Sequence, residues 1–151
     1  MIPEEEIINN IKDMGYITVT PRALYPSYYK LNDGTIIKAL AQIHGIVPDP
    51  KNPDGFGINS SNVVNAFVPK EKRSPERFFQ YDPADLVQGI VEDDMDFEVL
   101  RENFSVYDLS NGFVLSVKTV AGQVRKTKYF SKDGEPVYIV NTNPIIKVKK
   151  K

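Results

Sequence analysis

Two short stretches decide the fold: Tyr29-Lys-Leu-Asn-Asp-Gly34 and Tyr107-Asp-Leu-Ser-Asn-Gly112. They match at an offset of 78 residues, and their Tyr, Leu and Gly are identical. A small polar residue, Asp33 or Asn111, precedes each glycine. Asp-Gly and Asn-Gly are typical of hairpin turns, because both residues of the pair tolerate a positive φ. The sequence therefore predicts two hairpins that begin in the same way.

The strands that follow these turns also correspond. A second turn is expected in each copy, at Asp54-Gly55 and Asp133-Gly134, and beyond it the best offset becomes 82 residues. Apolar residues alternate with period two through both copies, which is typical of half-buried antiparallel strands. We predict two three-stranded meanders, with strands at 27–31, 35–47 and 56–68 and at 105–109, 113–125 and 137–149. A chance likeness between two ordinary hairpins is the alternative.

A unit of this size is too small to bury enough apolar surface alone. The two meanders are therefore expected to pack on one another, as a small barrel or a two-layer sandwich. The predicted fold is mainly β, in a β-rich α+β class. We expect one domain, with repeat 1 at about 27–68, an acidic helical connector at 70–104 and repeat 2 at about 105–149.

Two short helices complete the prediction. Pro3, the acidic residues that follow it and an apolar stripe indicate a helix at 3–14. A strand is expected at 16–20, stopped by Pro21, with irregular chain as far as Pro26. Asp82 and Pro83 favour a helix from about 83 to 91, whereas 95–103 fits either a helical turn or a strand. Pro144 is expected at a sheet edge or a bulge.

The composition of the 151-residue chain excludes several kinds of site. There is no cysteine, which excludes disulfide scaffolds, zinc ribbons, Fe–S clusters and thiol nucleophiles. His44 is the only histidine, so one chain cannot build a catalytic triad or a two-histidine metal site. No nucleotide-binding glycine motif follows a strand. We therefore expect no catalytic residue, no cofactor and no metal.

The sequence also bears on location. No stretch approaches 18 apolar residues, and the first residues resemble neither a secretory signal nor a transit peptide. The expectation is a cytoplasmic protein without a membrane partner.

Charge is unevenly distributed along the chain. Residues 1–70 carry a formal net charge of −1, residues 71–104 carry −6, and residues 105–151 carry +6. The acidic candidates for partner binding are Glu92, Asp93, Asp94 and Asp96. The spacing of Asp94, Asp96 and Glu98 begins like a calcium loop, but Val99 and Ser105 stand where such a loop needs Gly and Glu. A solvated acidic patch is therefore favoured over a metal site.

The basic candidates for partner binding lie in the second copy: Arg125, Lys126, Lys128, Lys147 and Lys149, with Tyr129 among them. Rings on a positive sheet face allow bases to stack while lysines neutralise phosphates, and either Tyr129 or Tyr138 is a candidate ring. Lysines on a terminal strand also guard a sheet edge against unwanted pairing.

The favoured hypothesis is a non-catalytic macromolecular interaction module, a small subunit or accessory factor of a larger assembly. Its expected partner is another protein or a second copy of itself, because segregated charge suits docking on an oppositely charged surface. The alternative is binding of RNA or single-stranded nucleic acid through the basic second repeat and the tail. A small-molecule or catalytic site near His44, Tyr29 and Asp33 is the third possibility, and it requires a formed pocket.

Overall fold

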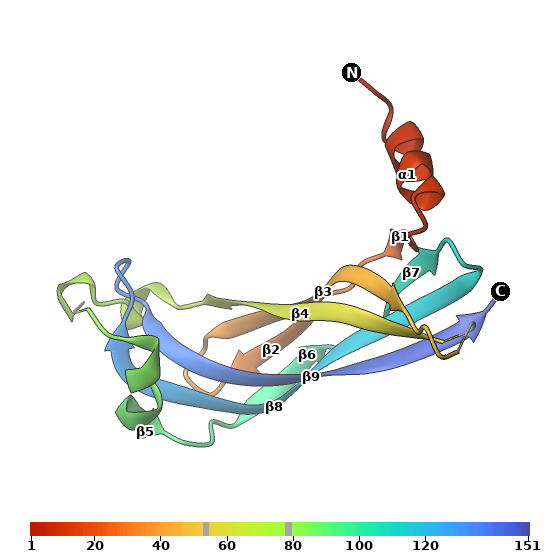
Figure 1. Cartoon of the computed structure of the whole chain (residues 1–151). Helices are drawn as coiled ribbons and strands as arrows, with labels where there is room; N and C mark the ends of the chain where they lie inside the picture. Colours follow the sequence, from red (N-terminus) through yellow and green to blue (C-terminus); the bar gives the residue numbers. More distant parts are fainter. Residues whose placement is uncertain (53–54, 78–79) are drawn as a thin grey trace.

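The computed structural model describes residues 1–52, 55–77 and 80–151, and these form two antiparallel sheets (Figure 1). The first sheet has the order β4-β3-β2-β6. The second has the order β1-β7-β8, and β8 also pairs with β5 and β9. The strands are β1 (Val19–Ala23), β2 (Ser27–Leu31), β3 (Ile36–Pro48), β4 (Phe56–Phe67), β5 (Ile90–Glu92), β6 (Phe97–Arg101), β7 (Ser105–Leu109), β8 (Phe113–Phe130) and β9 (Pro136–Lys150).

The mainly β fold and its two similar meanders are confirmed. β2-β3-β4 and β7-β8-β9 each run antiparallel, and their registers correspond at the predicted offsets of 78 and 82. Tyr29 pairs with Ile37, just as Tyr107 pairs with Leu115. Both long hairpins also carry an irregularity at the same place, between Ile43 and Gly45 and between Ala121 and Gln123. A shared irregularity is a stronger correspondence than shared alternation, because generic hairpins have no reason to bulge at equivalent residues.

The strand that precedes each meander pairs with the other meander. β1 lies against β7 with Val19 opposite Leu109, whereas β6 lies against β2 with Phe97 opposite Leu31. These pairs are also related by an offset of 78. The sequence left this exchange undetected, because period-two patterning identifies a strand but not its neighbour.

Two buried clusters form the core, and each combines residues from both meanders. One contains Tyr29, Leu31, Ile37, Met95, Ala121 and Val124. The other contains Ala41, Ile46, Tyr107, Leu109, Leu115 and Val117. A buried tyrosine from each meander also bonds the backbone of the other meander. The Tyr29 hydroxyl accepts from the Ala121 amide at 3.0 Å, and the Tyr107 hydroxyl donates to the Ala41 carbonyl at 3.4 Å. Neither meander therefore has a core of its own.

The two sheets do not close into a hydrogen-bonded barrel within the described residues, because no ladder joins β4 to β9. Among the described residues, β4 pairs only with β3 and β9 pairs only with β8, each on one side. Pro144 lies in β9, which agrees with the edge position expected for it.

Several local expectations were wrong. β1 continues through Pro21, which an outermost strand tolerates because one side of it has no ladder to complete. Of the two alternatives expected for 95–103, the strand is the one observed, as β6 (Phe97–Arg101). The expected helix at 83–91 is instead two 3-10 turns, Pro83–Asp85 and Val87–Gly89, followed by β5. Gly89 disfavours a helix, because glycine loses more conformational freedom on folding than other residues, and it lies against the Tyr129 ring; Ile90 then pairs with Thr127 in the sheet.

The hairpin turns also differ in detail from the expectation. Gly34, Gly112 and Gly134 have a positive φ, but no other described residue except Gly15 does. Asp33 and Asn111 therefore act through their side chains, which accept from the amides of Thr35 and Phe113 at 3.0 and 3.3 Å. Asp54 lies outside the described residues.

The predicted first helix is present as α1 (Glu4–Asp13), and it buries none of its residues. Figure 1 shows it projecting from one end of the sheets, while the 3-10 turns lie at the opposite end. The other 3-10 turns are Lys70–Lys72 and Pro75–Arg77. No described helix has the length and apolar character needed to cross a bilayer.

Candidate functional site

A polar cluster joins the first turn of one meander to the long strands of the other. The Asp33 carboxylate accepts from the Tyr138 hydroxyl at 2.5 Å and from the Lys126 ammonium at 3.2 Å. Thr35 donates its amide to Asp33 at 3.0 Å, and its hydroxyl lies 3.0 Å from that of Tyr138. The side chains of Asp33 and Lys126 are only 10% and 24% exposed, so this ion pair is well shielded from solvent.

The surroundings fix the protonation of this cluster. Burial alone raises the pKa of the Asp33 carboxyl, but the hydrogen bonds from Tyr138, Thr35 and Lys126 outweigh it and hold that pKa below its ordinary value. Burial and the adjacent carboxylate raise the pKa of Tyr138. At neutral pH the cluster is therefore a carboxylate held by a phenol and an ammonium.

The equivalent place in the other meander is apolar. The offsets relate Thr35 to Phe113 and Tyr138 to Phe56, and these two phenylalanine rings meet edge to face at 5.4 Å. The fold therefore accepts either an apolar or a polar arrangement here. The polar version uses its groups internally, since the carboxylate, the phenol and the ammonium bind one another.

Three of the sequence-predicted rings and cations make contacts within the molecule. Lys126 and Tyr138 belong to the polar cluster. Tyr129 is 8% exposed and stacks on Tyr81 with ring centroids 4.9 Å apart, so it does not present a face for a base. The buried Tyr129 ring therefore leaves no open face for the predicted base stacking, and the Tyr138 hydroxyl is bound within the polar cluster.

The other two cations of this part of β8 differ. Lys128 is exposed, with its ammonium 5.5 Å from the centre of the Tyr129 ring. Arg125 is half-buried, and its Nε has no hydrogen-bond partner among the described residues.

The acidic segment docks in part on the basic strand of its own molecule. Glu92 lies opposite Lys126 in the β5–β8 pairing, and its carboxylate accepts from the Asn32 amide group at 3.2 Å. The Asp93 carbonyl accepts from Gln123 at 3.1 Å. Asp94 and Asp96 follow in the bend that leads to β6. In the part of the chain that the structure describes, no group of three metal-ligating side chains gathers.

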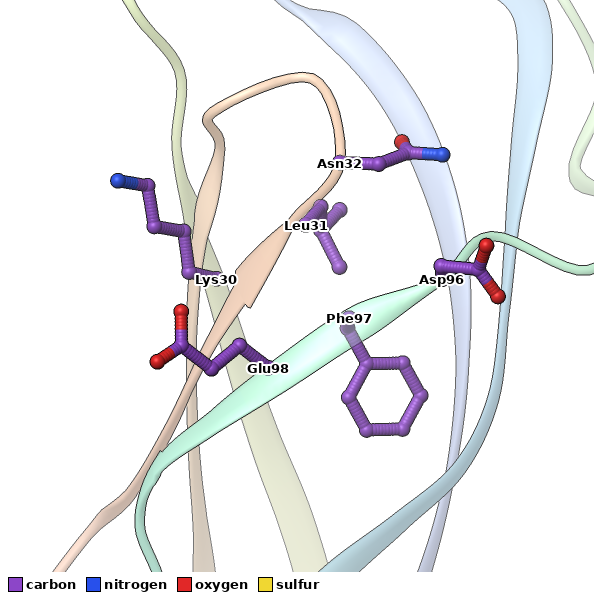
Figure 2. Close-up of a pocket in the computed structure, with 6 residues that line it drawn as sticks. All are labelled: Lys30, Leu31, Asn32, Asp96, Phe97 and Glu98. Atoms are coloured by element: carbon purple, nitrogen blue, oxygen red, sulfur yellow. The ribbon is translucent and has the colours of Figure 1, made fainter.

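Asp96 borders a hollow of about 320 Å³ at the ends of β2 and β6 (Figure 2). Lys30 and Glu98 extend from its rim to the same side, and Asn32 and Asp96 lie at its other end. The backbone closes this end, because the Asn32 amide donates to the Asp96 carbonyl at 3.0 Å. The equivalent hydrogen bond in the other half runs from the Ser110 amide to the Thr18 carbonyl, also at 3.0 Å. The hollow therefore lies beside a backbone hydrogen bond that both halves of the molecule contain.

A basic face lies on the outer side of the second sheet. We use this name for Lys118, Lys147 and Lys149 together with Phe104. The ammonium groups of Lys118 and Lys147 lie 4.9 and 4.6 Å from the centre of the Phe104 ring. Lys149 occupies the next outward position of β9, in register with Val114.

One acid borders the basic face. The Asp108 carboxylate accepts two hydrogen bonds from the Arg22 guanidinium, one from Nε at 3.1 Å and one from Nη2. The Lys151 ammonium lies 3.3 Å from the same carboxylate. The hydrogen bond from Arg22 is the main reason that the pKa of Asp108 lies below its ordinary value. Asp108 is thus neutralised by these two cations.

Sequence reasoning located Lys147 and Lys149 but missed Phe104 and Lys118. The signal was present, because Lys118 falls on the outer face of the alternating β8 pattern, opposite Ile145 on the β9 strand that carries Lys147. Phe104 lies just before β7, where no periodicity applies. His44 is exposed, and its Nε2 lies 2.6 Å from the Ser61 hydroxyl.

Comparison with known proteins finds no matching family, no curated relative and no similar solved structure.

Proposed function

We propose that this chain is a non-catalytic interaction module, a small accessory subunit whose basic face binds an acidic segment of a protein partner. We further propose that residues 1–151 act as one domain built from two like units. The shared core clusters support this, because each draws on both meanders.

The observation that carries the proposal is a comparison between the two halves. The offsets relate Lys118, Lys147 and Lys149 to Leu40, Asn65 and Phe67. β3 and β4 adopt the same pairing with these neutral residues, so the fold does not require the lysines. Edge protection explains a lysine on β9, but Lys118 lies on β8, which pairs with β9 at this position and with β7 along the preceding residues Val114–Val117.

The chemistry of the basic face suits carboxylates. Exposed ammonium groups attract anions over roughly a Debye length, about 8 Å at physiological ionic strength. Phe104 adds apolar contact area between two cations, so a segment that alternates acidic and apolar residues satisfies both. Such steering adds chiefly to the association rate and to specificity.

One observation favours a second candidate, single-stranded nucleic acid. Phe104 is an aromatic ring flanked by cations, and base stacking on a ring combined with phosphate neutralisation is how sequence-tolerant binders hold single strands. This candidate depends on Phe104, now that Tyr129 and Tyr138 are engaged elsewhere.

Fluorescence polarisation with two labelled probes tests the proposal: a peptide of alternating Glu and Leu, and an oligouridylate. We expect the peptide to bind, and Lys118→Gln combined with Lys147→Gln to weaken it at least tenfold. Lys30→Gln combined with Lys38→Gln removes the same charge from the first sheet and is the matched control.

Three outcomes contradict the protein-partner proposal. The first is that the peptide does not bind at low salt. The second is that the Lys118→Gln/Lys147→Gln variant and the Lys30→Gln/Lys38→Gln control lose equal affinity for the peptide, and the third is tighter binding of the oligouridylate than of the peptide. In the last case the nucleic-acid alternative predicts that three phosphate contacts give a slope of about −2 in log affinity against log salt, and that Phe104→Ala removes binding.

A further inference from the structure

The outer edge of β4 lacks the protection that the equivalent strand, β9, carries. β4 (Phe56–Phe67) has 12 residues and contains neither a charged residue nor a proline. Its side chains are mostly exposed, including Val63 and Val64 at 37% and 36%. Within the described residues its only strand partner is β3.

The equivalent strand, β9, carries the usual protection. Pro144 removes one backbone donor, and Lys147 and Lys149 place charge on its outward positions. A long uncharged edge with free backbone groups is a template for another strand. One outer strand is therefore protected by charge and a proline, whereas the other carries neither.

We infer that β4 pairs antiparallel with β4 of a second copy, about a twofold axis at Ser61. In this register the inward residues of one copy meet inward residues of similar character in the other. Phe56 meets Ala66, Ile58 meets Val64, and Ser60 meets Asn62. Apolar residues thus oppose apolar ones and polar residues oppose polar ones, which is the self-complementarity that a twofold interface needs.

Charge argues against the other pairings. Two β9 strands paired in the equivalent register, about Asn143, place Lys147 opposite Ile139 and Lys149 opposite Val137, which sets charged residues against apolar ones. Pairing β4 with β9 of another copy uses two different edges, and such a heterologous contact generates a ring or an open-ended filament. Pairing β4 with itself closes with two copies and opposes no charges.

The paired strands extend over residues 56–66 of each copy, which allows about ten backbone hydrogen bonds. The first sheets of the two copies then form one continuous sheet of eight strands. The basic face lies on the second sheet, so this interface leaves it free, and the dimer does not depend on the proposed function.

Cysteine crosslinking tests the register, because the natural chain has no cysteine. Ser61→Cys places two thiols directly opposite one another, with Cα atoms about 5 Å apart, within the range of a disulfide. Asn65→Cys is the control, because its own copy lies eight positions away along the strand, about 26 Å. We expect the Ser61→Cys variant to oxidise rapidly to a covalent dimer and the Asn65→Cys variant to form none.

Sedimentation or light scattering tests the interface without a thiol. The wild type is expected at twice 17.1 kDa, and Ser61→Lys and Val63→Lys at the monomer mass with unchanged circular dichroism. Asn143→Lys, at the β9 position equivalent to Ser61, is expected to remain dimeric. A monomeric wild type at all concentrations overturns the inference. So does dissociation by Asn143→Lys alone, or faster crosslinking of the Asn65→Cys variant than of the Ser61→Cys variant.

Discussion

Replacing Asp33 by Asn tests whether the polar cluster holds the two meanders together. The substitution retains an oxygen for the Thr35 amide but removes the charge that faces Lys126 and Tyr138. Hydrogen bonds to charged groups contribute about 1.5–3 kcal/mol each. The new amide regains part of this by donating to the Tyr138 oxygen, so the net loss of unfolding free energy is about 3 kcal/mol.

The pairing with Lys126 is isolated by a double-mutant cycle with Lys126→Met, measured by urea unfolding at neutral pH. Removal of one partner leaves a shielded charge unpaired, whereas removal of both does not. The double variant should therefore lose about 1–2 kcal/mol less unfolding free energy than the two single variants lose in sum. Asn111→Asp, in the exposed equivalent turn, should change stability by less than about 0.5 kcal/mol. Strict additivity, or an Asp33→Asn effect no larger than that of Asn111→Asp, refutes the reasoning.

Two further predictions concern packing and pH. Gly89→Ala places a Cβ 2.4 Å from Cε2 of Tyr129 and should cost about 1–3 kcal/mol in urea unfolding, while Gly122→Ala, whose nearest neighbour is 3.8 Å away, serves as its control. Burial and the hydrogen bond to Glu102 raise the pKa of Tyr29 to about 12, so its stabilising contribution is complete below pH 10 and is lost as the pH rises from 10 to 12. The urea midpoint should therefore fall over this range, and it should fall less steeply in Tyr29→Phe; an identical slope in both proteins contradicts the assignment. Tyr107 and Tyr138, whose pKa values are also raised, account for the slope that remains.

Sequence patterning identified strands well and their neighbours poorly. Alternation located β2, β7 and the long hairpins closely, because one apolar face per strand is a local property. The pairing of β1 with β7 and of β6 with β2 depends on contacts across the whole chain, which no local pattern encodes. Proline misled the prediction at Pro21 for the same reason, since its effect depends on whether the strand is central or outermost.

The candidate site shows the same division. Charge segregation along the sequence located Lys147 and Lys149, which do lie on an exposed strand. It also selected Lys126 and Tyr129, which the fold engages internally through Asp33 and Tyr81. Whether a charged or aromatic residue faces solvent depends on the strand face and on tertiary neighbours. Phe104 was missed because its two cations come from strands far along the chain.

The strand that precedes each meander pairs with the other meander, and cross-strand nuclear Overhauser effects in solution test this exchange. We expect backbone contacts between Val19 and Leu109 and between Phe97 and Leu31. Contacts of Val19 with β2, or of Phe97 with β7, would show that each meander keeps its own leading strand and would contradict the account.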